Sequence, residues 1–336
     1  MPLVSICIPT YNGGTHLAEC LDSALAQSFR DIDILLVDDA STDDTVAIAR
    51  SYARRDQRIR IAENERNLGL VGNWNQTVKL AQGEWIKFLH QDDRLEPDCV
   101  ARMLDAATPG VDLVATQRHV VFAPDTPDDI KRLYLRHLSD NNLASYFPGQ
   151  TYISPMEFAE ILLRVPDGNC IGEPTATMVR RTAFAHHGYF NPELTMLCDW
   201  EYWARLGVNT GLCYVDVPLA TFRVHSRGTS AQLRSTRRFR AFRLEPLLVL
   251  YEMTYSPSYA ALRAIARRRT PPVNLRQRLS DAVRGTRLEA SAEEDGGKAM
   301  AEWWAAIRRH PRLLAVPPAY ILRFLLEKGG LLSRRA

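Results

Sequence analysis

Two carboxylates and a histidine follow the apolar run from Trp85 to Leu89, in the order His90-Gln91-Asp92-Asp93. The apolar run has the composition of a buried strand. Acidic side chains just beyond the carboxyl end of such a strand can hold a divalent cation against a phosphate. Adjacent aspartates are also common in solvated loops, so this stretch alone leaves both interpretations open.

A second group of chemically useful side chains lies between Leu197 and Leu206, where the spacing predicts a helix that carries Asp199 and Glu201 near its start. The helix dipole stabilises a carboxylate in the first turn, which is a sufficient structural explanation. The same position also suits a general base that faces a cleft at the strand ends. A predicted strand ends at His225, and a single histidine of this kind is more often structural than a ligand.

The elements that position these side chains are predicted from hydrophobic periodicity. Strands are predicted at 3–8, 32–37, 58–62, 84–89 and 111–116, and helices at about 17–25, 41–54, 73–81 and 97–107. Ser41 and Asp44 have the spacing of a capping box that opens the second helix. Strands that alternate with helices of this length favour βαβ units and a parallel sheet.

Right-handed crossovers place the loops after parallel strands at one edge of the sheet. Three of these loops carry Thr10-Tyr11, Asp38-Asp39 and His90 to Asp93. Because these three loops converge, a binding or catalytic site is favoured over the alternative that Asp92 and Asp93 are a solvated pair. No G-x-G-x-x-G or Walker-type motif is present, so carboxylates and a cation would have to manage the phosphates of a bound nucleotide.

The rest of the chain is less regular. Residues 118–170 contain five prolines and are interpreted as a lid or an acceptor-shaping segment. A strand is predicted over 172–179, and residues 230–336 are predicted to be mostly helical.

Charge is distributed unevenly along the 336 residues. Residues 1–222 hold 19 Lys and Arg against 30 Asp and Glu, a net charge of −11, whereas residues 223–336 hold 23 against 9, a net charge of +14. The second part is therefore a basic tail on an acidic body. It suggests docking at an anionic membrane face. The alternatives are that the arginines cover the acidic body or support a homodimer, and no nucleic-acid module is recognisable.

The six cysteines are far apart and lack C-x-x-C spacing. This pattern favours reduced thiols in a cytoplasmic setting and argues against a disulfide framework or a zinc site. The chain shows neither the pattern of a signal peptide nor an apolar run of about 20 residues. We expect a cytoplasmic protein that is able to attach peripherally to the inner face of the cell membrane.

Taken in order, the motifs resemble family 2 glycosyltransferases with a GT-A fold, over about residues 3–228. The stretches that carry the resemblance are Val4 to Asn12, Val37 to Thr45, Asn67-Leu68-Gly69, His90 to Asp93, Asp199-Trp200-Glu201 and Phe222 to His225. The resemblance implies a mostly parallel, Rossmann-like open sheet flanked by helices in a domain spanning 1–228. A nucleotide-sugar-binding half (1–117) would precede an acceptor and catalytic half (118–228), and a helical basic region would follow over 229–336.

The resemblance also implies a role for individual residues. The nucleotide-sugar contacts would be Pro9, Thr10, Tyr11, Asp39, Asn67 and Asp92, with Tyr11 stacked on a uracil-like ring. The metal ligands would be Asp92, then Asp93, with His225 and His90 as further candidates. The catalytic base would be Asp199, with Glu201 as the second choice.

One position departs from the family pattern. His90 stands where the first aspartate of a D-x-D motif is commonest. Histidine is an acceptable ligand for Mn²⁺, and the sequence is equally compatible with a His90 outside the metal site. The Q-x-x-R-W motif of processive synthases is absent. The expected protein is an inverting, non-processive hexosyl- or N-acetylhexosaminyl-transferase that uses Mn²⁺ or Mg²⁺.

Its donor would be a nucleotide-sugar, with a UDP-sugar favoured, and its acceptor a lipid-linked or surface-polysaccharide glycan. A sugar nucleotidyltransferase is one alternative, but it would need a basic, glycine-rich loop, and Asn12-Gly13-Gly14 has no Lys or Arg close by in the sequence. The other alternative is a non-catalytic assembly protein at a membrane surface, which rests on the basic tail alone.

Overall fold

The computed structural model describes residues 1–166, 168–236, 239–293 and 296–314. One sheet runs through the molecule in the strand order β3-β2-β1-β4-β8-β6-β9-β5, with β7 paired to β9. The strands are β1 (Val4–Thr10), β2 (Ile32–Asp38), β3 (Ile59–Glu63), β4 (Trp85–Phe88), β5 (Arg94–Leu95), β6 (Leu113–Phe122), β7 (Tyr152–Ile153), β8 (Thr177–Arg180) and β9 (Leu212–Val224).

The first half of the sheet is parallel, because β1 pairs with β2 and β4, and β2 pairs with β3, all in the same direction. Every residue of β1 and β2 is buried, as expected for strands that are covered on both faces. The helices of this half are α1 (Gly14–Leu25), α2 (Thr45–Ala53), α3 (Leu70–Leu80) and α4 (Cys99–Ala106). Alternate β1 residues belong to two separate cores, which puts Ile6 against α1 and Cys7 against α3.

The predicted strands and helices of this half are observed, but the capping box is wrong. Helix α2 begins at Thr45, and its N-cap Asp44 makes no capping bond with its side chain. The Ser41 hydroxyl instead donates to Asp38 Oδ1 (2.6 Å) and accepts from the Asn12 amide (2.9 Å). Ser41 therefore belongs to the strand-end loops and not to the helix.

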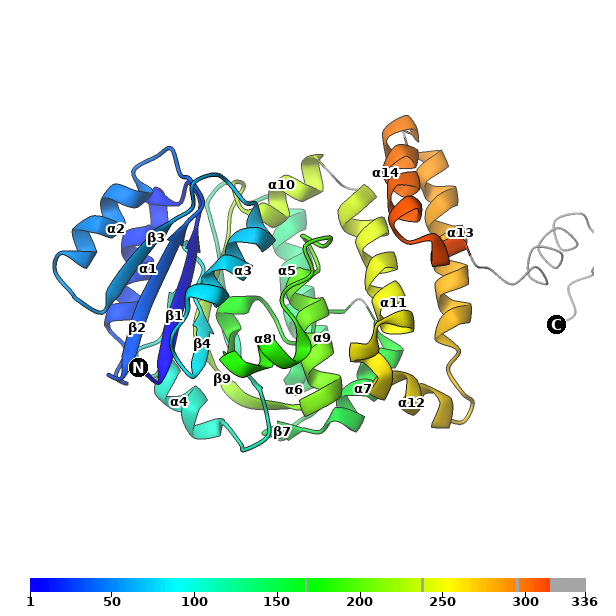
Figure 1. Ribbon diagram of the computed structural model, residues 1–336, viewed down its shortest axis with the longest axis horizontal. Helices are drawn as coiled ribbons and strands as arrows, with labels where there is room; N and C mark the ends of the chain where they lie inside the picture. The colour runs from blue at the N-terminus through cyan, green and yellow to red at the C-terminus, as the bar shows by residue number, and fades with distance from the viewer. Residues whose placement is uncertain (167, 237–238, 294–295, 315–336) are drawn as a thin grey trace, which may run out of the picture.

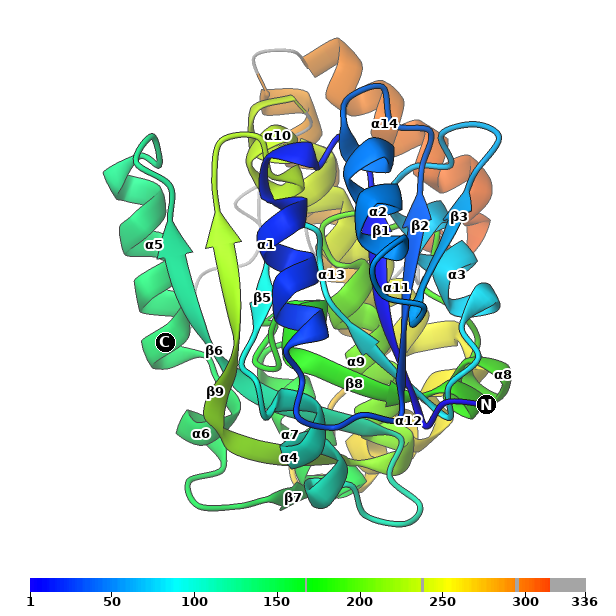
Figure 2. The same ribbon diagram turned by 90° about the vertical axis from the view of Figure 1, so that its left-hand side faces the viewer.

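Antiparallel strands join the second half of the sheet. Strand β8 lies between β4 and β6 and is antiparallel to both, whereas the long strands β6 and β9 run parallel (Figure 2). The predicted strand over 172–179 is shorter than expected, since the 3₁₀ turn η1 (Pro174–Ala176) precedes β8. The helices of this half are α5 (Asp128–Asp140), α6 (Leu143–Tyr146), α7 (Pro155–Arg164), α8 (Arg181–His187) and α9 (Cys198–Thr210).

The described part of the C-terminal region is helical, as predicted. Its elements are α10 (Thr229–Thr236), the π-helical turn η2 (Arg240–Leu244), α11 (Glu245–Tyr255), η3 (Pro257–Tyr259), α12 (Ala260–Arg268), α13 (Leu275–Ala292), α14 (Gly296–Arg309) and η4 (Pro311–Leu314). Helices α11 to α14 stand beside α9, on the side away from the parallel strands (Figure 1). Residues 315–336 of the predicted basic region lie outside the described residues.

The C-terminal helices share a core with the sheet. One hydrophobic cluster extends from Cys7 and Phe88 through Trp203 to Leu248 and Leu313. The boundary predicted at residue 228 stays a prediction. Among the residues that the structure describes, no helix combines the length and apolar character needed to cross a membrane. All six cysteines are buried and unpaired.

A buried ion pair joins α9 to its surroundings. Arg205 Nη2 lies 2.6 Å from Glu201 Oε2, and both side chains are less than a tenth exposed. The same guanidinium donates to the carbonyl oxygens of His187 and Tyr189, while the Tyr259 hydroxyl donates to Glu201 Oε1 (3.1 Å). Helix α9 is therefore tied to α8 and to the C-terminal helices through one pair of charges.

We expect Arg205→Leu to lower the free energy of unfolding by about 3–5 kcal/mol, because it leaves the buried Glu201 charge without its partner. The matched control is Arg50→Leu, which removes an ion pair to Glu63 of the same 2.6 Å length but on the surface. Its loss should cost no more than about 1 kcal/mol. Urea unfolding of both variants tests this, and equal losses would contradict a structural role for the Arg205 pair.

Candidate active site

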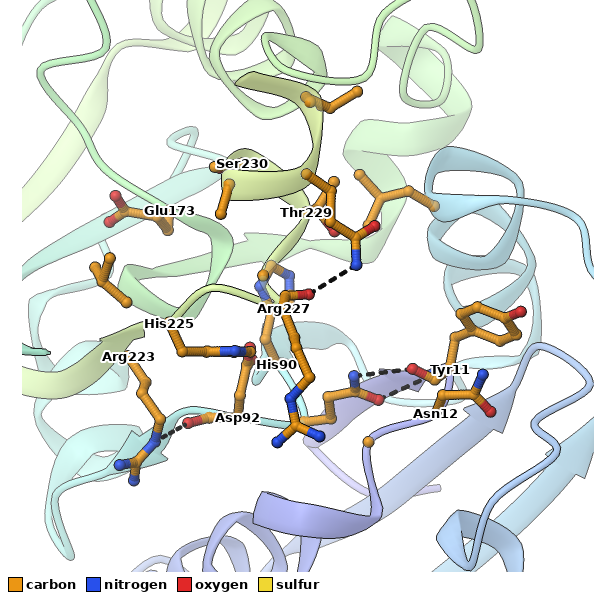
Figure 3. A pocket seen from close by; sticks show the side chains of 18 of the residues that line it. Tyr11, Asn12, His90, Asp92, Glu173, Arg223, His225, Arg227, Thr229 and Ser230 are labelled. Carbon is orange, nitrogen blue, oxygen red and sulfur yellow. Dashed lines mark hydrogen bonds and ion pairs between the residues drawn. The ribbon is translucent and has the colours of Figure 1, made fainter. Parts of the chain in front are cut away.

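A cavity of about 1100 Å³ opens at the carboxyl ends of the parallel strands (Figure 3). Its wall is built from the loops after β1, β2 and β4, the segment before η1, the start of α9, the end of β9, and helices α5 and α10. The sequence-predicted residues that line it are Pro9, Thr10, Tyr11, Asp39, Asn67, His90, Asp92, Asp199 and His225. Asp93 and Glu201 are not part of the lining.

The loop after β1 is fastened to the loop after β4 by a pair of reciprocal hydrogen bonds. The Tyr11 amide donates to Gln91 Oε1 (2.9 Å), and Gln91 Nε2 donates to the Tyr11 carbonyl (3.1 Å). Tyr11 is 48% exposed, which leaves its side chain accessible to a flat ligand. Gln91 was not predicted as a site residue, because the middle position of a D-x-D motif gives no signal of its own.

Asp39 organises the end of the cavity next to the loops after β1 and β2. It is buried, and its carboxylate accepts hydrogen bonds from Asn64 Nδ2 (2.8 Å), the Leu68 amide (2.8 Å) and the Gly69 amide (3.0 Å). Gly69 has a φ of 77°, a conformation that glycine adopts without strain. Asp39 thus holds the turn that presents the exposed Asn67 at the rim of the cavity.

Asp92 and His225 lie side by side in the wall of the cavity, with Asp92 Oδ2 2.8 Å from His225 Nε2 (Figure 3). Burial alone would raise the pKa of Asp92, but the hydrogen bond to His225 and the charges of His90 and His225 outweigh it and hold this pKa below its ordinary value. The carboxylate follows β4 and the imidazole follows β9, so two groups that are far apart in the sequence lie within hydrogen-bonding distance of each other.

This pair suits a divalent cation. Mg²⁺ is commonly held by one or two protein carboxylates together with the phosphates of a substrate, and imidazole is an accepted ligand of Mn²⁺. Among the described residues, no group of three or more His, Cys, Asp and Glu side chains stands close enough to hold a metal by itself. A cation at Asp92 and His225 would therefore need oxygen ligands from a bound diphosphate.

Asp93 faces the interior and not the cavity. Its Oδ1 accepts from the Arg223 amide (2.9 Å) and its Oδ2 from the Thr175 hydroxyl (2.5 Å). Burial and the nearby Asp92 charge raise the pKa of Asp93 well above its ordinary value. Both of its oxygens tie the loop after β4 to β9 and η1, which favours a positioning role over metal binding.

His90 also lines the cavity, but its ring packs on Trp74 with 4.8 Å between the ring centroids. Its Nε2 is buried and has no hydrogen-bond partner in the described part of the chain. Burial lowers the pKa of this imidazole, whereas the Asp92 charge acts in the opposite direction.

Asp199 is in the first turn of α9, where its Oδ1 accepts from the Trp200 amide (2.6 Å). Burial raises the pKa of Asp199 to about 7, and the Glu173 charge acts in the same direction. A carboxyl group with this pKa is matched to proton transfer near neutral pH. Glu201 points into a separate, smaller cavity beside Arg205, so of the two predicted bases only Asp199 reaches the main cavity.

A residue of the C-terminal region holds the backbone segment that precedes Asp199. Glu245, at the start of α11, is fully buried, and its Oε2 accepts from the backbone amides of Thr195 (3.0 Å), Met196 (2.7 Å) and Leu197 (2.9 Å). These three amides precede α9 directly. Glu245 was missed because its sequence position, in the basic region far from any motif, carries no signal.

Several lining residues beyond Gln91 were not predicted: Tyr134, Glu173, Arg227 and Arg234. Glu173 forms an ion pair with the buried Arg118. A charged residue between a glycine and a proline, directly before the turn η1, was the available signal for Glu173. The other three lie in segments without motifs.

The sequence is similar to those of a known protein family. The model of glycosyl transferase family 2 matches residues 5–188, which include both strand-end aspartate motifs. The chain belongs to this family. The uncharacterized protein MT1568 of Mycobacterium tuberculosis is 33% identical over 246 residues, or 70% of this chain and 72% of that protein. The putative glycosyltransferase EpsH of Bacillus subtilis is 33% identical over 153 residues, or 44% of either protein.

Solved structures show the same fold. TarS of S. aureus (residues 1–349, in complex with UDP-GlcNAc) superposes with a TM-score of 0.59 and 16% identity, over 89% of this chain and 79% of that one. The mannosyltransferase PcManGT from Pyrobaculum calidifontis, in complex with GDP-Man and Mn²⁺, gives 0.54 and 19%, over 92% and 81%. The predicted GT-A fold of a family 2 glycosyltransferase is confirmed.

The raised pKa of Asp199 predicts a pH-dependent stability. The folded protein holds this proton up to about pH 7, whereas the unfolded chain releases it near its ordinary pKa of about 3.9. The stabilisation that this bound proton gives to the folded state is therefore complete at low pH, and it is lost as the pH rises to 7. We expect the Tm of Asp199→Asn, relative to that of the unmodified protein, to increase from about pH 4 to pH 7 and then level off.

Thermal unfolding across this pH range measures the effect. Asp105→Asn, which removes an exposed carboxylate from α4, controls for the loss of one negative charge. If the two variants show the same pH dependence, burial of Asp199 is not the cause.

Proposed function

We propose that this glycosyltransferase moves a single sugar from a nucleotide-sugar to an acceptor hydroxyl with inversion, using Asp199 as the base. The observation that carries the proposal is the placement of Asp199 on the same cavity as the strand-end loops, with its pKa raised by burial to about 7. A base of this kind is half deprotonated at physiological pH and still basic enough to accept the proton of a hydroxyl.

The donor would occupy the end of the cavity formed by the loops after β1 and β2. Tyr11 offers an exposed ring for the base, and Asp39 and Asn67 lie where the ribose would follow. A uracil base is favoured by the resemblance described above. The two fold neighbours were solved with UDP-GlcNAc and with GDP-Man, which supports a nucleotide-sugar in general and leaves the base to be tested.

The diphosphate would lie at Asp92 and His225. A divalent cation bound there, Mn²⁺ or Mg²⁺, would supply charge stabilisation to the leaving diphosphate. Arg227 adds a second positive charge at this place: its Nη2 donates to the Thr15 hydroxyl (3.2 Å) at the start of α1, and its side chain points toward the strand-end loops (Figure 3). Asp93 is left out of the proposed ligand set, because both of its oxygens are engaged.

The acceptor hydroxyl would enter between the sugar and Asp199. Asp199 takes its proton as the oxygen attacks the anomeric carbon from the side opposite the diphosphate, which inverts the configuration. Glu245 keeps the backbone before Asp199 in place. Membership of a glycosyltransferase family favours this chemistry over the nucleotidyltransferase and the non-catalytic assembly protein.

We expect Asp199→Asn to lower kcat about 10²–10⁴-fold with little change in the KM for the donor, since proton removal is lost and donor contacts are kept. Asp92→Asn should instead weaken metal-dependent binding of the donor. A screen of UDP-, GDP- and dTDP-sugars with Mn²⁺ and Mg²⁺, read out as hydrolysis and calorimetric binding, identifies the donor for these assays. Asp105→Asn is the control, and full activity of Asp199→Asn would refute the assignment of the base.

We also propose that the C-terminal helices bring the enzyme to a lipid-linked acceptor at an anionic membrane face. Among the described residues from α12 to η4, the exposed cations are Arg267, Arg268, Arg276, Arg287, Lys298, Arg308, Arg309 and Arg312, and the exposed large apolar side chains are Leu288, Trp304 and Leu314. Basic surfaces with aromatic and aliphatic side chains bind anionic lipid through charge and apolar burial.

Flotation tests this proposal. The protein should float with vesicles that contain anionic phosphatidylglycerol and remain below with neutral phosphatidylcholine vesicles. Replacing Arg267 and Arg268 by glutamine should reduce flotation, because each cation near the surface contributes about 1 kcal/mol. Equal behaviour with both kinds of vesicle at moderate salt would remove the membrane from the proposal.

A further inference from the structure

The end of the cavity away from Tyr11 has an aromatic wall with one arginine on it. Tyr134 of α5 lies 6.1 Å from Phe222 of β9, measured between ring centroids. The Arg234 guanidinium carbon of α10 lies 5.5 Å from the Tyr134 ring centroid and 5.8 Å from that of Phe242. Tyr134, Phe222 and Arg234 all line the cavity. We call these three residues the aromatic-arginine wall.

Arg234 differs from the other arginines of this region in its charge environment. Arg118 is paired with Glu173, and Arg223 with Glu19. Within the described residues, no carboxylate forms an ion pair with Arg234, and its buried Nε has no hydrogen-bond partner. Aromatic rings attract a guanidinium and orient it, but their faces offer no strong acceptor for its N–H groups.

Arg227 and Arg234 contact different elements of the cavity wall. Arg227 contacts Thr15 of α1, on the side of the strand-end loops, whereas Arg234 stacks near Tyr134 of α5. Burial raises the pKa of both Tyr134 and Asp199, and the Glu173 charge adds to both shifts. The aromatic-arginine wall is therefore within electrostatic reach of the same glutamate as the proposed base, at the end where an acceptor would enter.

We propose that the aromatic-arginine wall is an acceptor subsite that binds an anionic oxygen group, either the phosphate of a lipid-linked acceptor or the carboxylate of a uronic acid. A guanidinium presents several N–H donors in a plane that matches the oxygens of phosphate and carboxylate. The Tyr134 and Phe222 rings supply flat apolar surface for the adjoining sugar or alkyl carbon atoms. This assignment rests on the proposed transfer reaction, because it takes the other end of the cavity to be filled by the donor.

Binding of matched probes to the full-length protein saturated with UDP and Mn²⁺ tests the subsite. Methyl glucuronide is compared with methyl glucoside, and decyl phosphate with decanol, by saturation-transfer NMR titration. At least one anionic probe should bind about tenfold or more tightly than its neutral partner. The probe that does so distinguishes a uronate from a lipid phosphate. Equal binding within both pairs, or no binding of either anion, overturns the proposal.

Arg234→Gln should abolish the preference for the anion, and Arg234→Lys should restore part of it by returning the charge without the planar donors. Arg54→Gln, at the exposed C-terminal end of α2, is the matched control and should bind the probes as the unmodified protein does. The Tm of each variant checks folding. Should Arg234→Gln prove unfolded, the lysine variant alone decides, because a preference as strong as that of the unmodified protein would contradict recognition by the planar donors.

The affinity for UDP separates this inference from the function on which it rests. If Arg234→Gln weakens UDP binding as much as it weakens binding of the anionic probe, Arg234 belongs to the donor site and the subsite is refuted. If the unmodified protein binds no nucleotide, the proposed transfer reaction fails instead. The probes are then titrated into the protein without nucleotide, where the same comparison of variants still decides the role of Arg234.

Discussion

Backbone amides that secondary structure leaves unpaired are satisfied by carboxylates, and the shape of the cavity depends on this one type of hydrogen bond. Asp39 accepts from two amides of the turn after β3, Asp93 from one amide of β9, and Glu245 from three amides before α9. A carboxylate is purely an acceptor with few sites, so an aspartate that holds a loop has little capacity left for a ligand. Asp92 and Asp199 retain oxygens toward the cavity, and they are the two acids to which chemistry is assigned.

The periodicity of the sequence was sufficient to predict the four parallel strands and the edge at which their loops meet, because every residue of β1 and β2 is buried and turn residues follow directly. It could not predict the direction of a side chain at that edge. Asp92 and Asp93 are neighbours, yet one faces the cavity and the other the interior, and the difference is set by Thr175 and Arg223, which are 82 and 130 residues away in the sequence.

Because side-chain direction could not be predicted, the sequence also could not distinguish the roles of the two acids in the second motif. Asp199 and Glu201 are two residues apart on one helix and so point in different directions. Only the packing of η3, which places the Tyr259 hydroxyl on Glu201, reveals that the glutamate is a structural anchor. Residues such as Gln91 and Glu245 could not be found at all from the chain, since their importance comes from the backbone groups they meet and not from any pattern around them.

Glu245 shows that the C-terminal helical region supports the candidate active site, which the basic composition of this region does not indicate. The family model ends at residue 188, before the proposed base, and the backbone that precedes this base is pinned by a side chain from beyond residue 228. Most of the proposed donor contacts lie within the matched residues, whereas His225 and the support of the proposed base lie beyond them. Exchanging the residues after 228 for those of a relative would therefore also replace the side chain that holds the backbone before the proposed base.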